Sequence, residues 1–376
     1  MVQELRFAHL ADLHLGGWRE KRMTELNFST FQQAITKVIE AQVDFCLFAG
    51  DIFNNAVPPL DIVNAAVKEF MRLQEAGIPL YVIGGSHDYS NTGKSFIQLL
   101  DRAGVFQDVG KFEHVDKETV NLQFTYDTDS PVRLGGILGR KNGLDKKQYQ
   151  QLQRASLDDG HCNIFFFHAT LNDFKPEFMR QVETEVTSSY LPKGFDYYAG
   201  GHVHTPMIGT YDRGTISYPG PLFPNNFSEL IREEPGFNLC SFSFSDRSVS
   251  VERQVLRTYA TEHVSCSFQS VGPLDAKERI EEALKKRDMA DKVVLLELEG
   301  IIDGKVSDIQ LSSIISQCYE KGAYHVLKNT YKLTSAEVAQ PEVKGGEQAQ
   351  DIEEEVMREH LREAKQPEAS YDLLKS

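Results

Sequence analysis

The chain has 376 residues, 41% hydrophobic and 25% charged, which is an ordinary composition for a soluble globular protein of two or three domains. Its formal net charge of −15 disfavours a broad basic surface for nucleic acid, because such binding depends on neutralising phosphates. Residues 337–376 carry 11 Asp and Glu against 5 Lys and Arg, and the rest of the chain is also acidic, so any nucleic-acid surface must be local or metal-assisted.

The cysteine pattern and the apolar runs indicate where the protein resides. Five scattered cysteines, with no C-x-x-C pair, argue against thiolate zinc and a disulfide framework and favour a reducing cytosol. A strand-like segment begins almost at the N-terminus and leaves no room for a signal peptide. No apolar run approaches the roughly 18 residues that a membrane helix needs. We therefore expect a cytoplasmic protein with no membrane contact, nucleoid-associated if it is prokaryotic.

Five short apolar runs, rich in Val, Ile, Phe and Tyr, predict buried strands. Each run ends in Asp or His: "LRFAHLADLH" (Asp12, His14), "VDFCLFAGD" (Asp51), "IPLYVIGGSHD" (His87, Asp88), "CNIFFFHAT" (His168) and "FDYYAGGHVH" (His202, His204). Amphipathic helices are predicted between the first three runs, with apolar faces at Phe31, Ala34, Ile35, Val38 and Ile39, and at Ile62, Ala65, Ala66, Phe70 and Leu73. This alternation is typical of an α/β fold, so the five strand ends should meet at one edge.

After the last of these histidines the pattern becomes β-rich, with hairpin turns predicted at Asp212-Arg213-Gly214 and Asp246-Arg247. From about Thr258 a small α+β domain is predicted, with strands at 262–270, 292–300 and 323–333 and helices at 273–286 and 306–318. Residues 335–350 are typical of a flexible linker. A helix is then predicted over 351–364, and its apolar side needs a partner to be stable.

The residues at the strand ends are those that bind metals. Residues i and i+2 of a strand point the same way, so Asp12 and His14 can bind one ion, and His202 and His204 should project together. Asp51 can offer each oxygen to a different metal. Mixed Asp and His ligands suit manganese, iron or zinc. Two ions about 3.5–4 Å apart would hold a phosphate, activate a water and stabilise a leaving oxygen.

Each motif alone carries little weight, since D-x-H and G-D occur by chance and Asp favours strand ends as a turn residue. A single buried His168 would be typical of a hydrogen-bonded core histidine. The ordered set, with every member at a strand end, indicates two-metal phosphoester hydrolysis.

The segments "FAHLADLHLGG", "LFAGDIFN", "GGHVH", "SYPGPLFPNNFSE" and "GFNLCSF" resemble motifs of the calcineurin-like metallophosphoesterases. Within them, the chain most resembles archaeal-type members of the meiotic-recombination-eleven and SbcD family of DNA double-strand-break repair nucleases. The resemblance spans about residues 5–257. It implies an α/β (α+β) fold in which residues 1–257 form a nuclease domain, a two-sheet β-sandwich flanked by helices. Residues 258–334 would form a capping domain that orients DNA, 335–350 a linker, and 351–376 a helical ATPase-binding segment.

The resemblance also implies roles for single residues. Metal position 1 would consist of Asp12, His14, a bridging Asp51 and His204, and metal position 2 of Asp51, Ser86, His168 and His202. His87 would be a catalytic proton donor to the leaving 3′ oxygen, with Asp88 orienting it. Two residues depart from the family pattern: Ser86 stands where an asparagine is usual, and Asn54 where a histidine is frequent. These departures bear on the affinity of metal position 2 and on exonuclease strength.

The resemblance implies a manganese-dependent DNA nuclease, a 3′–5′ exonuclease and single-strand endonuclease with two manganese ions per chain. It further implies a homodimer that binds a Rad-fifty or SbcC-like coiled-coil ATPase through its C-terminal helix. Two alternatives stay open. The protein could be mainly an end-tethering scaffold with weak catalysis, because of Ser86 and Asn54. It could also be a small-molecule phosphodiesterase, although such an enzyme needs neither a cap nor a docking helix.

Overall fold

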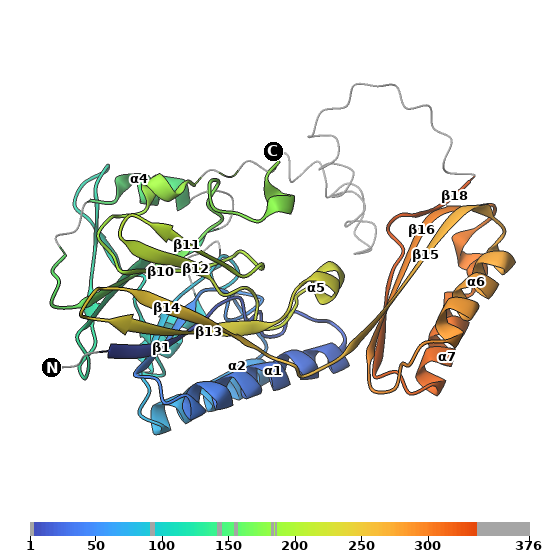
Figure 1. Cartoon of the computed structure of the whole chain (residues 1–376), viewed down its shortest axis with the longest axis horizontal. Helices are drawn as coiled ribbons and strands as arrows, with labels where there is room; N and C mark the ends of the chain where they lie inside the picture. The colour runs from blue at the N-terminus through green and yellow to red at the C-terminus, as the bar shows by residue number, and fades with distance from the viewer. Residues whose placement is uncertain are drawn as a thin grey trace.

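A computed structural model describes residues 4–90, 95–140, 145–153, 157–181, 184 and 186–336. Two six-stranded sheets, which we call the first and second sheet, pack face to face (Figure 1). The first sheet has the order β14-β13-β1-β2-β3-β4 and the second β11-β12-β10-β9-β8-β7. Neighbouring strands run parallel from β1 to β4, and likewise through β8, β9, β10 and β12. Because of this, the carboxyl ends of the central strands in each sheet lie at one edge.

The strand bounds follow the apolar runs of the sequence. The first sheet contains β1 (Glu4–Leu10), β2 (Phe45–Ala49), β3 (Leu80–Ile83), β4 (Gln107–Asp108), β13 (Gly236–Ser243) and β14 (Val249–Val255). The second contains β7 (Thr125–Tyr126), β8 (Val132–Ile137), β9 (Cys162–His168), β10 (Tyr197–Gly201), β11 (Met207–Tyr211) and β12 (Gly214–Tyr218). A separate hairpin joins β5 (Phe112–His114) to β6 (Val120–Leu122). The two predicted hairpin turns are confirmed, since β11 pairs antiparallel with β12 and β13 with β14.

Helices cover the outer face of the first sheet. They include α1 (Lys21–Glu40) and α2 (Leu60–Glu75), whose predicted apolar faces are buried through Phe31, Ile35, Phe70 and Leu73. Three shorter helices are α3 (Phe96–Arg102), α4 (Asp145–Gln151) and α5 (Phe227–Arg232). Single 3₁₀ turns lie at Glu177–Met179 and Ser188–Tyr190.

A buried core fills the space between the two sheets. Phe7 of β1 stacks on Phe45 of β2 with ring centroids 5.1 Å apart, and the edge of Tyr197 from β10 meets the same Phe7 ring at 5.1 Å. All three rings are fully buried, so burial of their apolar surface holds the sheets together. The fold therefore agrees with the expected two-sheet sandwich flanked by helices.

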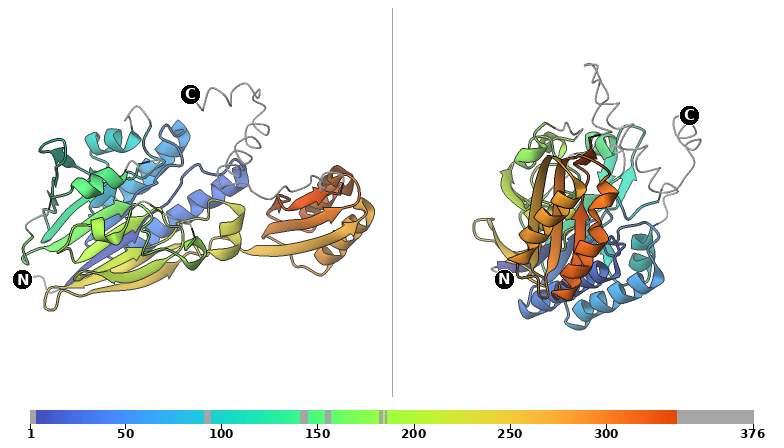
Figure 2. Two further views of the ribbon diagram at one scale, coloured as in Figure 1. Left: turned by 90° about the horizontal axis from the view of Figure 1, so that it is seen from above. Right: turned by 90° about the vertical axis from the view of Figure 1, so that its right-hand side faces the viewer.

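A third sheet belongs to a smaller unit, which we call the cap (Figure 2). It consists of β15 (Thr261–Val271), α6 (Pro273–Lys285), β16 (Val293–Ile302), a 3₁₀ turn (Val306–Ile309), α7 (Leu311–Glu320), β17 (His325–Asn329) and β18 (Leu333–Ser335). Strand β16 pairs parallel with β15, β17 and β18. The two helices pack on one face of this sheet around Val264, Leu296 and Ile314.

Two predicted cap elements are wrong in detail. The helix expected over 306–318 is split, because Gln310 takes a left-handed backbone conformation (φ 59°) and separates the 3₁₀ turn from α7. The strand expected over 323–333 is also split, because a turn interrupts pairing between β17 and β18. The predicted helix over 351–364, and the linker from 337 onward, lie outside the described residues. In the part of the chain that the structure describes, no helix has the length and apolarity to cross a membrane.

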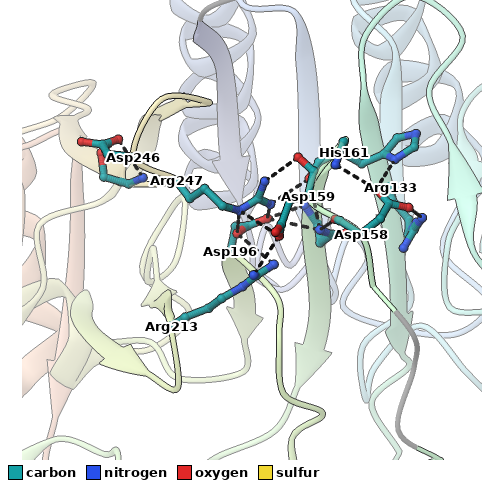
Figure 3. Close-up of polar contacts among 11 residues, drawn as sticks. Arg133, Asp158, Asp159, His161, Asp196, Arg213, Asp246 and Arg247 are labelled. Atoms are coloured by element: carbon teal, nitrogen blue, oxygen red, sulfur yellow. Dashed lines mark hydrogen bonds and ion pairs between the residues drawn. The ribbon is translucent and has the colours of Figure 1, made fainter.

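A charged network joins the two sheets near the amino ends of their parallel strands (Figure 3). Asp196, just before β10, is fully buried and accepts hydrogen bonds from Nε of Arg247 and from the backbone N–H of Asn163. Arg247 lies in the β13–β14 turn and also donates to the carbonyl of His161. Arg133 of β8 pairs with Asp158 in the same region. Because Arg247 comes from the first sheet and Asp196 from the second, the network fixes this edge of the sandwich.

Candidate metal centre

The carboxyl ends of β1, β2, β3, β9 and β10 bring the predicted site residues together at the opposite edge. The loops after β1 and β2 run side by side, since the N–H of Asp12 donates to Gly50 and that of His14 to Asp51. The N–H of His202, which follows β10, donates to the carboxylate of Asp12. The N–H of His87 donates to Asp51. Hydrogen bonds among the loops thus set the positions of the side chains.

The backbone at this edge is strained. Ten non-glycine residues of the described chain have positive φ, and four of them are site residues: Asp12 (52°), His14 (43°), Asp51 (51°) and His202 (85°). Each such residue costs about 1–3 kcal/mol, which the surrounding structure must offset. The expectation that Asp12 and His14 align through strand alternation is wrong, because β1 ends at Leu10. Left-handed turns, and not strand pleating, aim both side chains into the centre.

Three groups of side chains have their ligand atoms within 4.8 Å of one another: Asp12, His14 and His204; Asp51, His168 and His202; and His14, Asp51 and His87. The first two groups match three members each of metal positions 1 and 2. The third group shares His14 with the first and Asp51 with the second, and it includes His87, which was expected to be a non-ligand. Except for the exposed His202 and the partly buried His87 and His204, these side chains are buried.

Hydrogen bonds on the outer nitrogen orient three of the imidazoles. Nδ1 of His168 lies 2.8 Å from the carbonyl oxygen of Ala49, and Nδ1 of His204 lies 2.9 Å from the Oε1 atom of Glu229. Nδ1 of His87 lies 2.9 Å from the carbonyl oxygen of Asn54. Since these oxygens only accept, each Nδ1 carries the proton and each Nε2 of a neutral ring has a free lone pair. This arrangement is typical of metal-binding histidines.

The ligand atoms that face the centre lie close to one another. Nε2 of His168 is buried and lies 3.2 Å from Oδ2 of Asp51. Nε2 of His14 lies 3.1 Å from Nε2 of His204 and 3.7 Å from Oδ2 of Asp51. Nitrogen lone pairs and carboxylate oxygens facing one another need a cation between them. The donor set therefore fits divalent ions that accept mixed nitrogen and oxygen ligands.

Nearby carboxylates favour positive charge at two of the imidazoles, whereas burial disfavours it at His14. Burial lowers the pKa of His168, but the Asp51 carboxylate outweighs burial and raises that pKa to about 10. Burial also lowers the pKa of His204, but the hydrogen bond to Glu229 and nearby carboxylates outweigh it and raise that pKa to about 9. Burial dominates at His14 and lowers its pKa to about 3. The nearby imidazoles overcome the burial of Asp51 and hold its pKa well below the usual range.

Glycines allow the backbone to approach the imidazole of His168. A Cβ on Gly50 would lie 2.2 Å from Nδ1 of His168, and Gly50 has a φ of 92° that side chains rarely adopt. A Cβ on Gly201 would lie 1.9 Å from the carbonyl oxygen of Ala49, the acceptor that orients the same ring. Both positions require glycine, because any side chain would displace His168.

The two departures from the family pattern have defined surroundings. The hydroxyl of Ser86 donates to Oδ2 of Asp51 at 3.4 Å, a long hydrogen bond. Asn54 contributes its backbone carbonyl to His87, and any residue at this position supplies that group. The frequent histidine is thus not needed to orient His87.

The expected role of Asp88 as the residue that orients His87 needs correction. The carboxylate of Asp88 is buried and accepts from the backbone N–H groups of Ile52, Phe53 and Gly85. These bonds join the loop after β2 to the loop after β3, while the Asn54 carbonyl orients the ring of His87. Asp88 acts on the centre through the backbone.

Glu229 is a site residue that the sequence analysis missed. It lies in α5, which was also not predicted, and its carboxylate binds Nδ1 of His204. The sequence carried a signal, since Asn226 and Glu229 have the spacing of a capping box. In the structure, Asn226 accepts from the N–H of Glu229 and caps α5.

Comparison with known proteins agrees with this geometry. The profile of the calcineurin-like phosphoesterases matches residues 5–206. The chain is 30% identical over 236 residues to the DNA double-strand break repair protein Mre11 of Methanococcus maripaludis, covering 60% of this chain and 59% of that protein. It is 26% identical over 262 residues to Mre11 of Methanocaldococcus jannaschii, covering 65% of each. An uncharacterized metallophosphoesterase of Bacillus subtilis, YhaO, is 27% identical over 274 residues, which cover 67% of this chain and 61% of that protein.

The matched segments thus span between 59% and 65% of the length of these relatives. The family profile covers more than half of the chain, and the residues it covers include Asp12, Asp51, His168 and His204. The strand order, the edge at which the ligands meet and the profile agree: this chain belongs to the calcineurin-like phosphoesterases.

Proposed function

We propose that the protein is a manganese-dependent nuclease that hydrolyses phosphodiester bonds of DNA at metal positions 1 and 2. The observation that carries the proposal is the orientation of His168 and His204, whose Nδ1 atoms are held by fixed acceptors while Nε2 faces the other ligand atoms of the centre. When bound, two divalent ions would hold the scissile phosphate and lower the pKa of an attacking water. The mixed Asp and His donors suit manganese among such ions.

The chain's own residues place the donors in advance. Oδ2 of Asp51 lies 3.7 Å from Nε2 of His14 in metal position 1 and 3.2 Å from Nε2 of His168 in position 2, so Asp51 could bridge them. The N–H of His87 fixes Oδ1 of Asp51 at 2.8 Å. Asp12 is held by the N–H of His202. Preorganisation of this kind lowers the cost of ordering the centre when substrate binds.

His87 is the candidate proton donor to the leaving oxygen. The Asn54 carbonyl fixes Nδ1–H, so the proton that His87 exchanges with substrate must lie on Nε2. The ring lies edge-on to His14 with centroids 4.9 Å apart, next to metal position 1, and is partly exposed. A group in this position can reach a phosphate held at the centre.

Three further parts of the proposal concern the substrate, the oligomeric state and a partner. The Mre11 proteins are named as DNA double-strand break repair proteins, which supports DNA as the substrate. We also propose a homodimer and a coiled-coil ATPase partner that binds the helix expected over 351–364. The support for this partner is the apolar side of that segment in the sequence: Ile352, Val356, Met357, Leu361 and Ala364.

A second function, a weakly catalytic scaffold for DNA ends, is favoured by one contact. The hydroxyl of Ser86 donates to Oδ2 of Asp51 at 3.4 Å, and we infer that it serves this carboxylate and not an ion at metal position 2. Position 2 would then have one oxygen ligand fewer than the family pattern, and an ion there would be held weakly.

The test compares cleavage of single-stranded DNA and of a small nucleotide diester by the wild-type chain and by His87→Ala, each with added manganese. We expect the wild type to cleave DNA faster, and His87→Ala to lose about 10²–10⁴-fold in rate while binding the same number of ions by calorimetry. One tightly bound ion with negligible cleavage by the wild type would instead support the scaffold. Faster turnover of the small diester would refute DNA as the substrate.

A further inference from the structure

We propose that helix α5 joins metal position 1 and the cap into one cooperative unit, with Glu229 as the positioning residue and the neighbouring Leu230 as the cap's anchor. The inference rests on the proposed two-metal function but not on the identity of the substrate. In Figure 1, α5 lies at the end of the two sheets that faces the cap. It is a six-residue helix, so its two functional side chains cannot move far apart.

The first link runs from α5 to His204. Oε1 of Glu229 accepts from Nδ1 of His204 at 2.9 Å and from Nδ2 of Asn226 at 2.7 Å, while Oε2 accepts from the N–H of Asn225 at 2.7 Å. Both oxygens are therefore bonded, which fixes the carboxylate. One residue past His204, the hydroxyl of Thr205 donates to Glu233 at 2.9 Å. Glu229 within α5 and Glu233 just after it thus hold the loop that carries His204.

The second link runs from α5 to the cap. Leu230 is 4% exposed and belongs to a buried cluster, which we call the seam, formed by Met23, Phe223, Leu230, Val293 and Leu295. Val293 and Leu295 lie in β16, the central strand of the cap sheet. Their side chains point away from the sheet face that α6 and α7 cover. Leu296, the next residue, packs on the helix-covered face. Burial at the seam therefore holds the cap against α5.

A third link starts from His14. Four residues later, Trp18 donates its indole N–H to the carbonyl of Pro224 at 2.9 Å and packs on the seam. Its ring meets Phe223, and Phe223 in turn meets Tyr259, which precedes the first cap strand. Two of the four residues of metal position 1, His14 and His204, are therefore connected to the seam by different segments.

The consequence is a linkage between metal binding and cap docking. The docked cap holds α5 and the loop that contains Trp18 in place, and these segments in turn position His204 and His14 beside Asp12. If the cap moves away, the ligands of metal position 1 are less well ordered and bind an ion more weakly. Thermodynamic linkage then requires the converse, that a metal at position 1 stabilises the docked cap by the same factor. Coupling between sites typically amounts to about 5–150-fold in affinity.

Adjacent residues of β16 provide a matched test. Leu295→Ala removes a seam side chain, whereas Leu296→Ala removes an equally buried side chain from the cap's own core, and both are 0% exposed. Neither residue contributes to the metal centre. Manganese binding to the full chain is measured by calorimetry. We expect Leu295→Ala to raise the Kd of one ion at least about 5-fold and to leave the other unchanged, while Leu296→Ala binds as the wild type does.

Two further measurements test the same coupling if Leu295→Ala fails to fold. Arg22 is exposed and donates to the carbonyl of Tyr324 in the cap, so Arg22→Ala perturbs the same contact at the surface. It should weaken the same ion in the same direction. In the wild type, manganese should slow amide hydrogen exchange in residues 293–297 and 324–327, and in Glu229→Gln this protection should be reduced.

The outcomes separate the inference from the function on which it rests. Unchanged manganese binding in Leu295→Ala and Arg22→Ala would overturn the coupling and leave the two-metal centre intact. Equal weakening in Leu295→Ala and Leu296→Ala would also overturn it, because the effect would then follow cap stability and not the seam. A wild-type chain that binds no divalent ion would remove the proposed function itself.

Discussion

Replacing Ser86 with asparagine tests whether this residue limits metal position 2. The Ser86 side chain ends one bond beyond Cβ and its hydroxyl donates to Asp51. An asparagine places an amide oxygen one bond farther into the centre and supplies a neutral oxygen ligand of the kind that divalent ions accept. The change also frees Oδ2 of Asp51 from its hydroxyl donor.

The magnitude follows from comparing these two effects. A hydrogen bond of 3.4 Å is long, so releasing Asp51 contributes below about 1 kcal/mol. Loss of a group that only supports a metal ligand costs about 10–100-fold in affinity. Adding a direct ligand should gain at least that factor, about 1.4–2.7 kcal/mol. The ligand effect therefore decides the result, and Ser86→Asn should lower the Kd of the weaker manganese ion at least about 10-fold.

Calorimetric titration of the metal-free chain with manganese measures both ions in one experiment. Ser86→Ala is the matched control, because it removes the hydroxyl and adds no ligand. If the hydroxyl serves Asp51, as the hydrogen bond indicates, Ser86→Ala keeps the affinity of the weaker ion or raises it slightly. Loss of that ion in Ser86→Ala would show that serine is a ligand, and unchanged binding in Ser86→Asn would refute the reasoning on geometry.

Three further predictions concern the two edges of the sandwich. Asp196→Ala should lower the free energy of unfolding in urea by about 3 kcal/mol, because Arg247 loses its buried partner. Manganese binding should stay at two ions. A loss of stability below about 0.5 kcal/mol would contradict the role of the network. Asp88→Ala should lower the same free energy by about 3 kcal/mol, because three backbone N–H groups lose their acceptor. It should also slow hydrolysis. Wild-type stability in this variant would be evidence against a role of Asp88 in joining the two loops. A chelator should abolish hydrolysis, and added manganese should restore it; activity that survives chelation would exclude the metal mechanism.

The residue pattern predicted an α/β fold and the edge at which its candidate ligands meet, whereas the two-sheet sandwich came from the family resemblance. Apolar runs that stop at Asp or His are strong signals, because a buried strand and its polar end are both encoded locally, as at Asp51 and His168. The helices α1 and α2 followed from their apolar periodicity, and the two hairpins from their turn residues. These elements depend on neighbours within a few residues of the chain.

The parts that were wrong or missed depend on partners distant in the sequence. The left-handed backbone at Gln310, Asp12 and His14 was not predicted. Asp12 and His14 donate their N–H groups to Gly50 and Asp51 of the loop after β2, which local sequence does not reveal. The acceptor for His87 is the carbonyl of Asn54, which no side-chain pattern can reveal, because every residue has one. Glu229 is the exception, since its capping box was readable, although its bond to His204 was not.

The rings of Phe7 and Tyr197, which meet between the two sheets, have a consequence beyond stability. In the proposed centre, metal position 1 would take Asp12 from the loop after β1 and His204 from the loop after β10. Metal position 2 would take Asp51 from the first sheet and His168 from the second. A sideways slide of one sheet past the other by a fraction of an ångström would therefore distort both donor sets at once. Packing of these aromatic rings between the sheets therefore helps to set the distance between the donor groups of the two proposed metal positions.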